Sequence, residues 1–195
     1  MLNEKFVIVG AVIAAIGGLS YLIDTIKGKA KPNRVTFSLW ALVPLIAFAA
    51  EVKQGVGIQS LMTLMVALSP LSIFIASFVN KKSEWKLNSF DLICGALSLI
   101  GLLLWYITKV GNIAIAFSII ADGLASLPTI VKSYKYPETE NVWLYLGYSI
   151  SAALTLLTIN TWGFAHYGFP FYILILCGTI FSLVQFKIGK KLSKD

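Results

Sequence analysis

The amino-acid sequence predicts an all-α membrane protein with seven transmembrane helices, arranged as two parallel triple-helix bundles joined by a linker helix. Hydrophobic residues make up 57% of the 195 residues and charged residues only 13%, and the mean hydropathy is +0.81. So little polar surface cannot coat a water-soluble domain of this size. The apolar residues form seven runs, and most of the basic residues fall in alternate gaps between them.

Each apolar run is long enough to cross the hydrocarbon core of a bilayer, which takes about 20 helical residues. In chain order, the runs span residues 6–26, 35–51, 56–79, 90–107, 113–131, 142–159 and 169–186. We expect all seven to be helices, because a backbone in lipid must satisfy its own hydrogen bonds and the runs are too long for barrel strands. The first run belongs to the fold rather than to a signal peptide, because it is too long for one and lacks a small-residue cleavage site.

The distribution of Lys and Arg predicts an orientation. Thirteen of the 16 basic residues lie in the first, third and fifth gaps and in the C-terminal tail. They are Lys27, Lys29, Lys31, Arg34, Lys81, Lys82, Lys86, Lys132, Lys135, Lys187, Lys190, Lys191 and Lys194. Because short loops rich in Lys and Arg stay in the cytoplasm, we expect a plasma-membrane protein with its N-terminus outside and its C-terminus cytoplasmic. The pI of 9.4 then reflects contact with membrane lipids rather than with nucleic acid.

Small and acidic residues within the spans predict how the helices pack and where they end. In the first span, Gly10, Ala14 and Gly18 recur every four residues and form a surface for close contact with another helix. Glu51, at the end of the second span, is expected at the membrane interface. Asp91 is expected to cap the start of the fourth span, since an acid stabilises a helix N-terminus.

Prolines inside three spans mark candidate hinges. They are Pro44, Pro70 and Pro128. A proline within a membrane helix frees a backbone carbonyl and permits a kink.

A weak internal repeat relates two parts of the chain. Each copy contains a helix end, a short basic loop with a proline, and the start of the next helix. The matched positions are Thr25 with Thr129, Lys27 with Lys132, Pro32 with Pro137, Leu39 with Leu144, and Trp40 with Tyr145. An even number of membrane crossings separates the copies, so the repeat is parallel, as in some secondary transporters. The expected units are a first bundle over 1–79, a linker helix with its loops over 80–111, a second bundle over 112–188, and a basic tail over 189–195.

The second copy of the repeat carries a resemblance to a known family. The segment 127–134, which reads LPTIVKSY and is followed by Pro137 and a new helix, resembles the PQ-loop, with Thr129 where the glutamine usually stands. The chain looks like a divergent member of the PQ-loop and SWEET group of small transporters. The resemblance implies seven helices as two triple-helix bundles linked by a fourth, with the N-terminus outside. The first copy departs from the motif, because Asp24 and Thr25 replace the Pro-Gln pair.

Asp122 is the strongest candidate for a functional residue. It lies at the centre of the fifth span, where a carboxyl group is energetically costly and usually marks a pathway, a pair or a proton relay. Ser118 and Ser126 lie one turn to either side and extend a polar stripe along one helix face. Two interpretations remain open: a role in binding solute or a coupling proton, and a carboxyl group that only hydrogen-bonds a neighbouring helix. The family resemblance favours the first, since some PQ-loop transporters use a membrane aspartate in this helix.

Aromatic residues in the second and sixth spans are candidates for lining a solute pocket. Tyr145 and Tyr148 recur at helical spacing, and the repeat aligns Trp40 with Tyr145. Rings with polar tips suit a small polar solute, although an interfacial aromatic belt is the alternative. The two cysteines, Cys94 and Cys177, are expected to be buried free thiols. His166 is expected in an outer loop over 160–168, without partners for a metal.

The predicted function is transport of a small solute, such as a sugar, amino acid or metabolite, by alternating access. Whether transport is coupled to protons and whether the chain forms a homo-oligomer stay open. The alternative is a non-transporting seven-helix receptor or binding protein of KDEL-receptor-like architecture, since fold does not dictate function. An enzyme is not expected, because no GxSxG, HExxH or paired carboxylates occur, and no cofactor or metal is expected.

Overall fold

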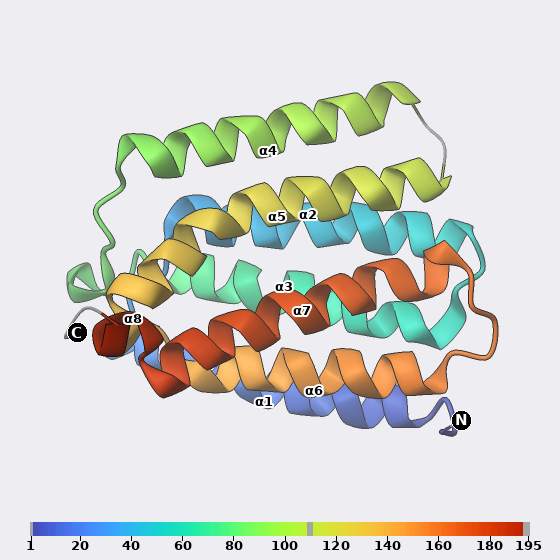
Figure 1. Cartoon of the computed structure of the whole chain (residues 1–195), viewed down its shortest axis with the longest axis horizontal. Helices are drawn as coiled ribbons and strands as arrows, with labels where there is room; N and C mark the ends of the chain where they lie inside the picture. Colours follow the sequence, from blue (N-terminus) through green and yellow to red (C-terminus); the bar gives the residue numbers. More distant parts are fainter. Residues whose placement is uncertain (1, 109–110, 193–195) are drawn as a thin grey trace.

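The computed structural model describes residues 2–108 and 111–192, and the regular structure of this part of the chain is entirely helical. Its helices are α1 (Phe6–Ile26), α2 (Arg34–Lys53), η1 (Gly57–Gln59), α3 (Ser60–Ala76), η2 (Lys81–Ser83), α4 (Ser89–Thr108), α5 (Gly111–Lys135), η3 (Pro137–Thr139), α6 (Val142–Thr158), α7 (Phe164–Phe186) and α8 (Ile188–Leu192). The long helices lie side by side with their axes roughly aligned (Figure 1).

Within the described residues, five helical segments are long and apolar enough to cross a membrane: Phe6–Ile26, Arg34–Lys53, Gly57–Ala76, Asn112–Lys135 and Phe164–Phe186. The apolar segments Ser89–Ile100 and Val142–Thr158 are shorter. Large apolar side chains are exposed along the outer faces of α1 and α4, as expected where a helix contacts lipid. The chain is therefore a multi-pass, membrane-type helical protein.

The connections between helices fall at two opposite ends of the bundle. The segments 27–33, 77–88 and 136–141 lie at the end that carries α8, which we call the basic end, and the N-terminus lies at the other end (Figure 1). Most of the basic residues gather at the basic end. Lys194 of the basic tail, and Lys109 between the fourth and fifth predicted spans, lie outside the described residues.

The neighbours of each helix follow a repeated pattern. Helix α3 packs against α1 and α2, and α7 packs correspondingly against α5 and α6. Helix α1 also packs against α6, and α2 against α5. If α1, α2 and α3 are exchanged with α5, α6 and α7 respectively, the same pairs of helices are in contact. Helix α4 stands outside the pattern, against α5 and the edge of α2 (Figure 1).

Equivalent asparagine caps start α2 and α6. The Asn33 side chain accepts hydrogen bonds from the backbone N–H groups of the second and third residues after it, and Asn141 does the same at α6. Counted from these caps, Trp40 corresponds to Tyr148 and not to Tyr145. The pairing of Trp40 with Tyr145 in the sequence repeat is therefore wrong by about one helical turn, because Asn141 lies four residues after Pro137 whereas Asn33 directly follows Pro32.

Three sequence expectations at helix ends need correction. Helix α7 begins at Phe164, so His166 lies in a helix and not in an outer loop. Helix α5 continues to Lys135, so Lys132 and Lys135 lie on its last turn rather than in a loop. Glu51 is only 1% exposed and accepts a hydrogen bond from Thr63 of α3, so it is a buried residue and not an interfacial one.

The short helix α8 is held against the loop that follows α5. Lys190 of α8 forms an ion pair with Glu138 of η3 at 2.6 Å. The hydrogen bond from the Lys190 ammonium lowers the pKa of the Glu138 carboxyl below its usual value. Both side chains are about half exposed, so the pair contributes little to stability.

Glycines let α1 and α6 pack closely. A Cβ atom on Gly17 would lie 2.5 Å from the backbone carbonyl oxygen of Trp143, and one on Gly147 would lie 3.0 Å from that of Ile13. Gly10 and Ala14 also face α6, whereas Gly18 faces Ser69 of α3. The small residues of α1 therefore serve two helix interfaces rather than one.

Gly17→Ala is expected to destabilise the fold by about 1–3 kcal/mol, because the added methyl group meets backbone and cannot be relieved by a rotamer change. Gly178→Ala is the matched control, since its Cβ would have no neighbour closer than 4.0 Å. The control is expected to be neutral or stabilising by up to about 1 kcal/mol, as is usual for glycine within a helix. Thermal unfolding in detergent measures both, and equal midpoints for the two variants would contradict the close packing.

Candidate functional site

Asp122 lies at the middle of α5 and is 1% exposed. Its Oδ2 atom accepts a hydrogen bond of 2.7 Å from the hydroxyl group of Tyr172 on α7. A carboxyl group buried at this depth needs such partners, because its removal from water is costly. Tyr172 was not a candidate in the sequence, since an isolated tyrosine in the seventh span carries no sign of its partner.

The Asp122 carboxyl group also lies next to α2, which belongs to the other half of the repeated helix pattern. Trp40 of α2 lies next to Asp122. Its indole Nε1 and the Asp122 Oδ1 are both buried, and neither makes a hydrogen bond of standard geometry within the described part of the chain, although the indole lies close enough to the carboxyl group for a weak donation. An unpaired buried donor or acceptor costs about 1–3 kcal/mol. The seam between α2 and α5 thus holds a donor and an acceptor that a small polar group can satisfy.

The two serines beside Asp122 differ in their bonding. Ser118 is fully buried, and its hydroxyl group has no partner among the described residues. Ser126 donates to the backbone carbonyl of Gly123 in its own helix. Ser118 therefore adds a third polar group with free hydrogen-bonding capacity on the Asp122 face of α5, and Ser126 does not.

The predicted pocket aromatics are all buried, but they have different partners. The Tyr145 ring meets the Trp40 ring edge-on, with centroids 6.5 Å apart. The Tyr148 hydroxyl group donates to the backbone carbonyl of Met65 on α3 at 3.3 Å. Trp40, which lies next to Asp122, therefore also contacts Tyr145, whereas the polar tip of Tyr148 binds to a neighbouring helix.

A buried thiol lies among these residues. Cys177 of α7 is 3% exposed and is within electrostatic reach of Asp122, Tyr145 and Tyr148. It is a free cysteine, as is Cys94 on α4. No sequence pattern connects Cys177 with Asp122, because the two lie on different helices and share no motif.

A cluster of charged and phenolic side chains lies at the basic end of the helix bundle. Glu140 accepts hydrogen bonds from the hydroxyl groups of Tyr21 at 2.8 Å and Tyr145 at 2.6 Å, and it pairs with the ammonium group of Lys132 at 2.6 Å. We call Tyr21, Lys132, Glu140 and Tyr145 the basic-end cluster. The side chains of Lys132 and Glu140 are at most 1% exposed, so the ion pair is fully desolvated.

The basic-end cluster connects parts of the chain that lie far apart in sequence. Lys132 also donates to the backbone carbonyl of Lys31, and its Nζ atom lies 4.9 Å from the centre of the Trp85 ring. Tyr21 belongs to α1, while Lys132 and Glu140 belong to the second half. From the sequence, Lys132 was used only to predict the membrane orientation, and Glu140 was not a candidate. The available signal in the sequence was a Lys and a Glu eight residues apart, one on each side of Pro137.

The candidate hinge prolines lie within helices as expected. Pro44, Pro70 and Pro128 are buried inside α2, α3 and α5, and α7 contains a fourth, Pro170. The last part of α5, which contains Pro128, bends away from the start of α4 (Figure 1). An interior proline removes a helix hydrogen bond and is a common cause of such a bend.

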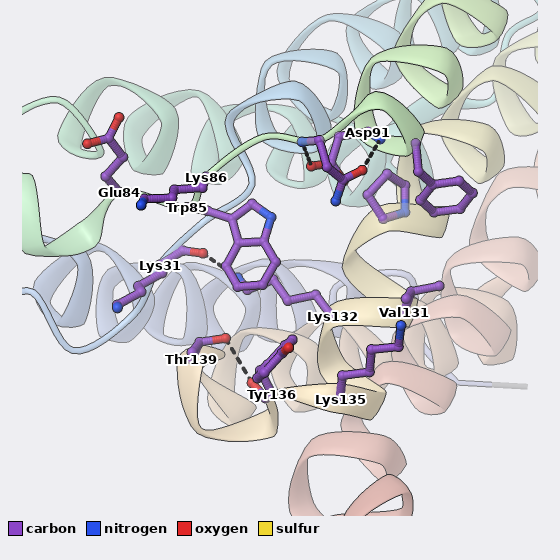
Figure 2. A pocket seen from close by; sticks show the side chains of 13 residues that line it. Lys31, Glu84, Trp85, Lys86, Asp91, Val131, Lys132, Lys135, Tyr136 and Thr139 are labelled. Atoms are coloured by element: carbon purple, nitrogen blue, oxygen red, sulfur yellow. Dashed lines mark hydrogen bonds between the residues drawn. The ribbon is translucent and has the colours of Figure 1, made fainter.

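A pocket of about 560 Å³ opens where α5 diverges from α4 (Figure 2). Its lining comes from the start of α4, the end of α5 and the segments around them. The lining residues are Lys31, Glu84, Trp85, Lys86, Asn88, Phe90, Asp91, Pro128, Val131, Lys132, Lys135, Tyr136 and Thr139. We call this the α4–α5 pocket. None of the sequence candidates except the hinge Pro128 lines it.

Within residues 2–108 and 111–192, no group of His, Cys, Asp and Glu is placed to hold a metal ion. No family model matches the chain, and neither curated proteins nor solved structures give a match. The chemistry of the site therefore has to be inferred from its own geometry.

Proposed function

We propose that the chain transports a small polar solute across the plasma membrane by alternating access. In this proposal α1 to α3 and α5 to α7 are two parallel triple-helix bundles, α4 links them, and the N-terminus lies outside. The observation that carries the proposal is the Asp122 carboxyl group, buried in the middle of α5 next to Trp40 of the other bundle, with one oxygen that makes no hydrogen bond of standard geometry. Transporters of this kind bind their solute near the midplane between the repeats.

The basic-end cluster supports a gate on the cytoplasmic side. Tyr21 of the first bundle meets Glu140 of the second through a hydrogen bond rather than through apolar packing. Polar contacts of this type can be exchanged for contacts with water when two bundles separate, whereas exposed apolar surface would be costly. In this proposal, the contact between Tyr21 and Glu140 corresponds to a closed gate.

The same residues support a role for protons. Asp122 is the only acidic residue in the described part of α5. A negative charge at this depth is costly, so the carboxyl group favours binding of a proton or of a polar solute that neutralises it. Trp40 lies next to Asp122 and contacts Tyr145, and the two rings offer faces and edges to a sugar, amino acid or metabolite.

Access of water to Cys177 from both sides of the membrane tests the proposal. The variant Cys94→Ala leaves Cys177 as the single thiol, buried beside Asp122. A small, charged and membrane-impermeant methanethiosulfonate reagent is applied to right-side-out and to inside-out vesicles. Alternating access predicts that the reagent modifies Cys177 in both preparations, and that modification blocks solute uptake.

The double variant Cys94→Ala and Cys177→Ala is the control and is expected to show no modification and no block. Protection of Cys177 from both sides, together with no uptake of any sugar, amino acid or metabolite by proteoliposomes, would contradict the transporter proposal.

A membrane receptor or binding protein is the second candidate, and one observation favours it. The α4–α5 pocket lies at the basic end, and four lysines line it. A receptor that binds its ligand there needs no second opening. It predicts that the reagent reaches Cys177 from one side or from neither, and that the protein binds a ligand without moving it.

A further inference from the structure

The α4–α5 pocket has a net positive lining that the proposed transport cycle does not use. Lys31, Lys86 and Lys135 line it, and none of the three forms an ion pair within the described residues. Lys132 also lines the pocket but is committed to Glu140. Three lysines lining one hollow favour an anionic ligand.

The two acidic residues of the pocket are already engaged. Asp91 is buried and caps α4, where its carboxylate accepts from the backbone N–H of Asn88 while the Asn88 side chain accepts from the backbone N–H of Asp91. Glu84 lies at the rim, with its carboxylate 3.7 Å from the guanidinium group of Arg34. Neither acid therefore neutralises the three lysines.

Trp85 supplies a neutral donor at the centre of the pocket (Figure 2). Its indole Nε1 is buried and has no hydrogen-bond partner among the described residues. The ring is held between the Lys132 ammonium at 4.9 Å and the Tyr136 ring at 5.8 Å. Trp and Tyr occur together at the level of lipid headgroups because each ring has an apolar body and a polar tip.

One flank of the pocket is apolar and faces outward. Phe90 of α4 is 43% exposed and Val131 of α5 is 39% exposed, and both line the pocket. They lie within the first turn of α4 and the last two turns of α5, next to the level at which the basic loops begin. A ligand in the pocket therefore meets lysines on one side and lipid-facing apolar surface on the other.

We propose that the α4–α5 pocket binds the headgroup of an anionic phospholipid. Lys31, Lys86 and Lys135 contact the phosphate group, the Trp85 indole donates to one of its oxygens, and an acyl chain leaves along Phe90 and Val131. A free phosphate ester shares the headgroup chemistry but would leave the apolar flank uncovered. The proposal does not depend on transport, because the site holds neither Asp122 nor Cys177.

Binding of a short-chain phosphatidic acid to the full-length protein in detergent tests the proposal. The pocket variant carries Lys31→Gln, Lys86→Gln and Lys135→Gln. The matched control carries Lys27→Gln, Lys29→Gln and Lys81→Gln, which removes the same charge from the same end but outside the pocket. Each lysine near an anionic headgroup contributes roughly a fivefold factor in affinity, so the pocket variant should lose on the order of a hundredfold. The control should stay within about threefold of the unaltered protein.

Two further arms identify the source of the phosphate and the position of the lipid. Glycerol phosphate, which has the phosphate but no acyl chains, should bind much more weakly, and a zwitterionic phosphatidylcholine of equal chain length should not compete. A brominated phosphatidic acid should quench tryptophan fluorescence, and Trp85→Phe should remove most of that quenching. Equal losses in the two triple variants would overturn the site. Equally tight binding of glycerol phosphate would overturn the assignment to a lipid.

Discussion

Asp122→Asn is expected to abolish concentrative uptake of solute and its dependence on pH, while passive exchange continues. Asparagine keeps the size of the side chain and can still accept the hydrogen bond from Tyr172, so the fold should survive. It cannot take up or release a proton, which removes any coupling through this group. Uptake into proteoliposomes, driven by a proton gradient and compared with counterflow without one, measures the two activities separately.

Glu51→Gln is the matched control for this prediction. Glu51, in the last turn of α2, is another buried acidic residue of the described helices, and it binds Thr63 rather than a residue of the Asp122 site. It lies eleven residues beyond Trp40 on α2, about 16 Å along the helix. Its substitution should leave pH-dependent uptake in place. Normal pH dependence in Asp122→Asn would assign the carboxyl group a structural role only.

Lys132→Met is expected to destabilise the protein by about 3–5 kcal/mol, because it leaves the Glu140 carboxylate buried without its cation. The double variant Lys132→Met and Glu140→Gln should recover most of this loss, since neither buried charge then remains. Unfolding by denaturant in detergent, compared across both variants and the unaltered protein, measures the difference.

The exposed pair at α8 is the control for the basic-end cluster. Lys190→Met removes a cation at the same 2.6 Å distance from a carboxylate, but from a pair whose side chains are about half exposed. It should cost less than about 1 kcal/mol. If Lys132→Met costs no more than Lys190→Met, the buried ion pair does not stabilise the basic-end cluster.

Hydropathy predicted the central parts of the helices because length and apolar content are set by the bilayer and not by neighbours. The first predicted span has the bounds of α1. The start of α7 was predicted five residues late, because His166, Tyr167 and Gly168 lower the local hydropathy although the helix continues through them. A charge pattern likewise placed Lys132 in a loop, while the helix continues past it with the side chain turned into protein.

The sequence was less informative about the contacts of the candidate site. The position of Asp122 in the chain marked it as unusual, and the structure places it in the interior beside Trp40. Its bond to Tyr172 and its proximity to Cys177 depend on how α7 packs against α5, which a single sequence does not reveal. Glu140 was missed for a similar reason, because its partners come from three separate segments. The functional roles of these residues stay predictions.

The position of α4 outside the repeated helix pattern has a consequence for how such a chain can originate. Three crossings bring a chain out on the opposite side of the membrane from its start, so fusing two copies of a three-helix gene end to end would insert the second copy upside down. One added crossing restores the orientation of the second copy. In the proposed arrangement α4 is that adapter, and its peripheral packing fits a segment acquired for topology. An ancestor made of two identical three-helix chains would have had no need of it.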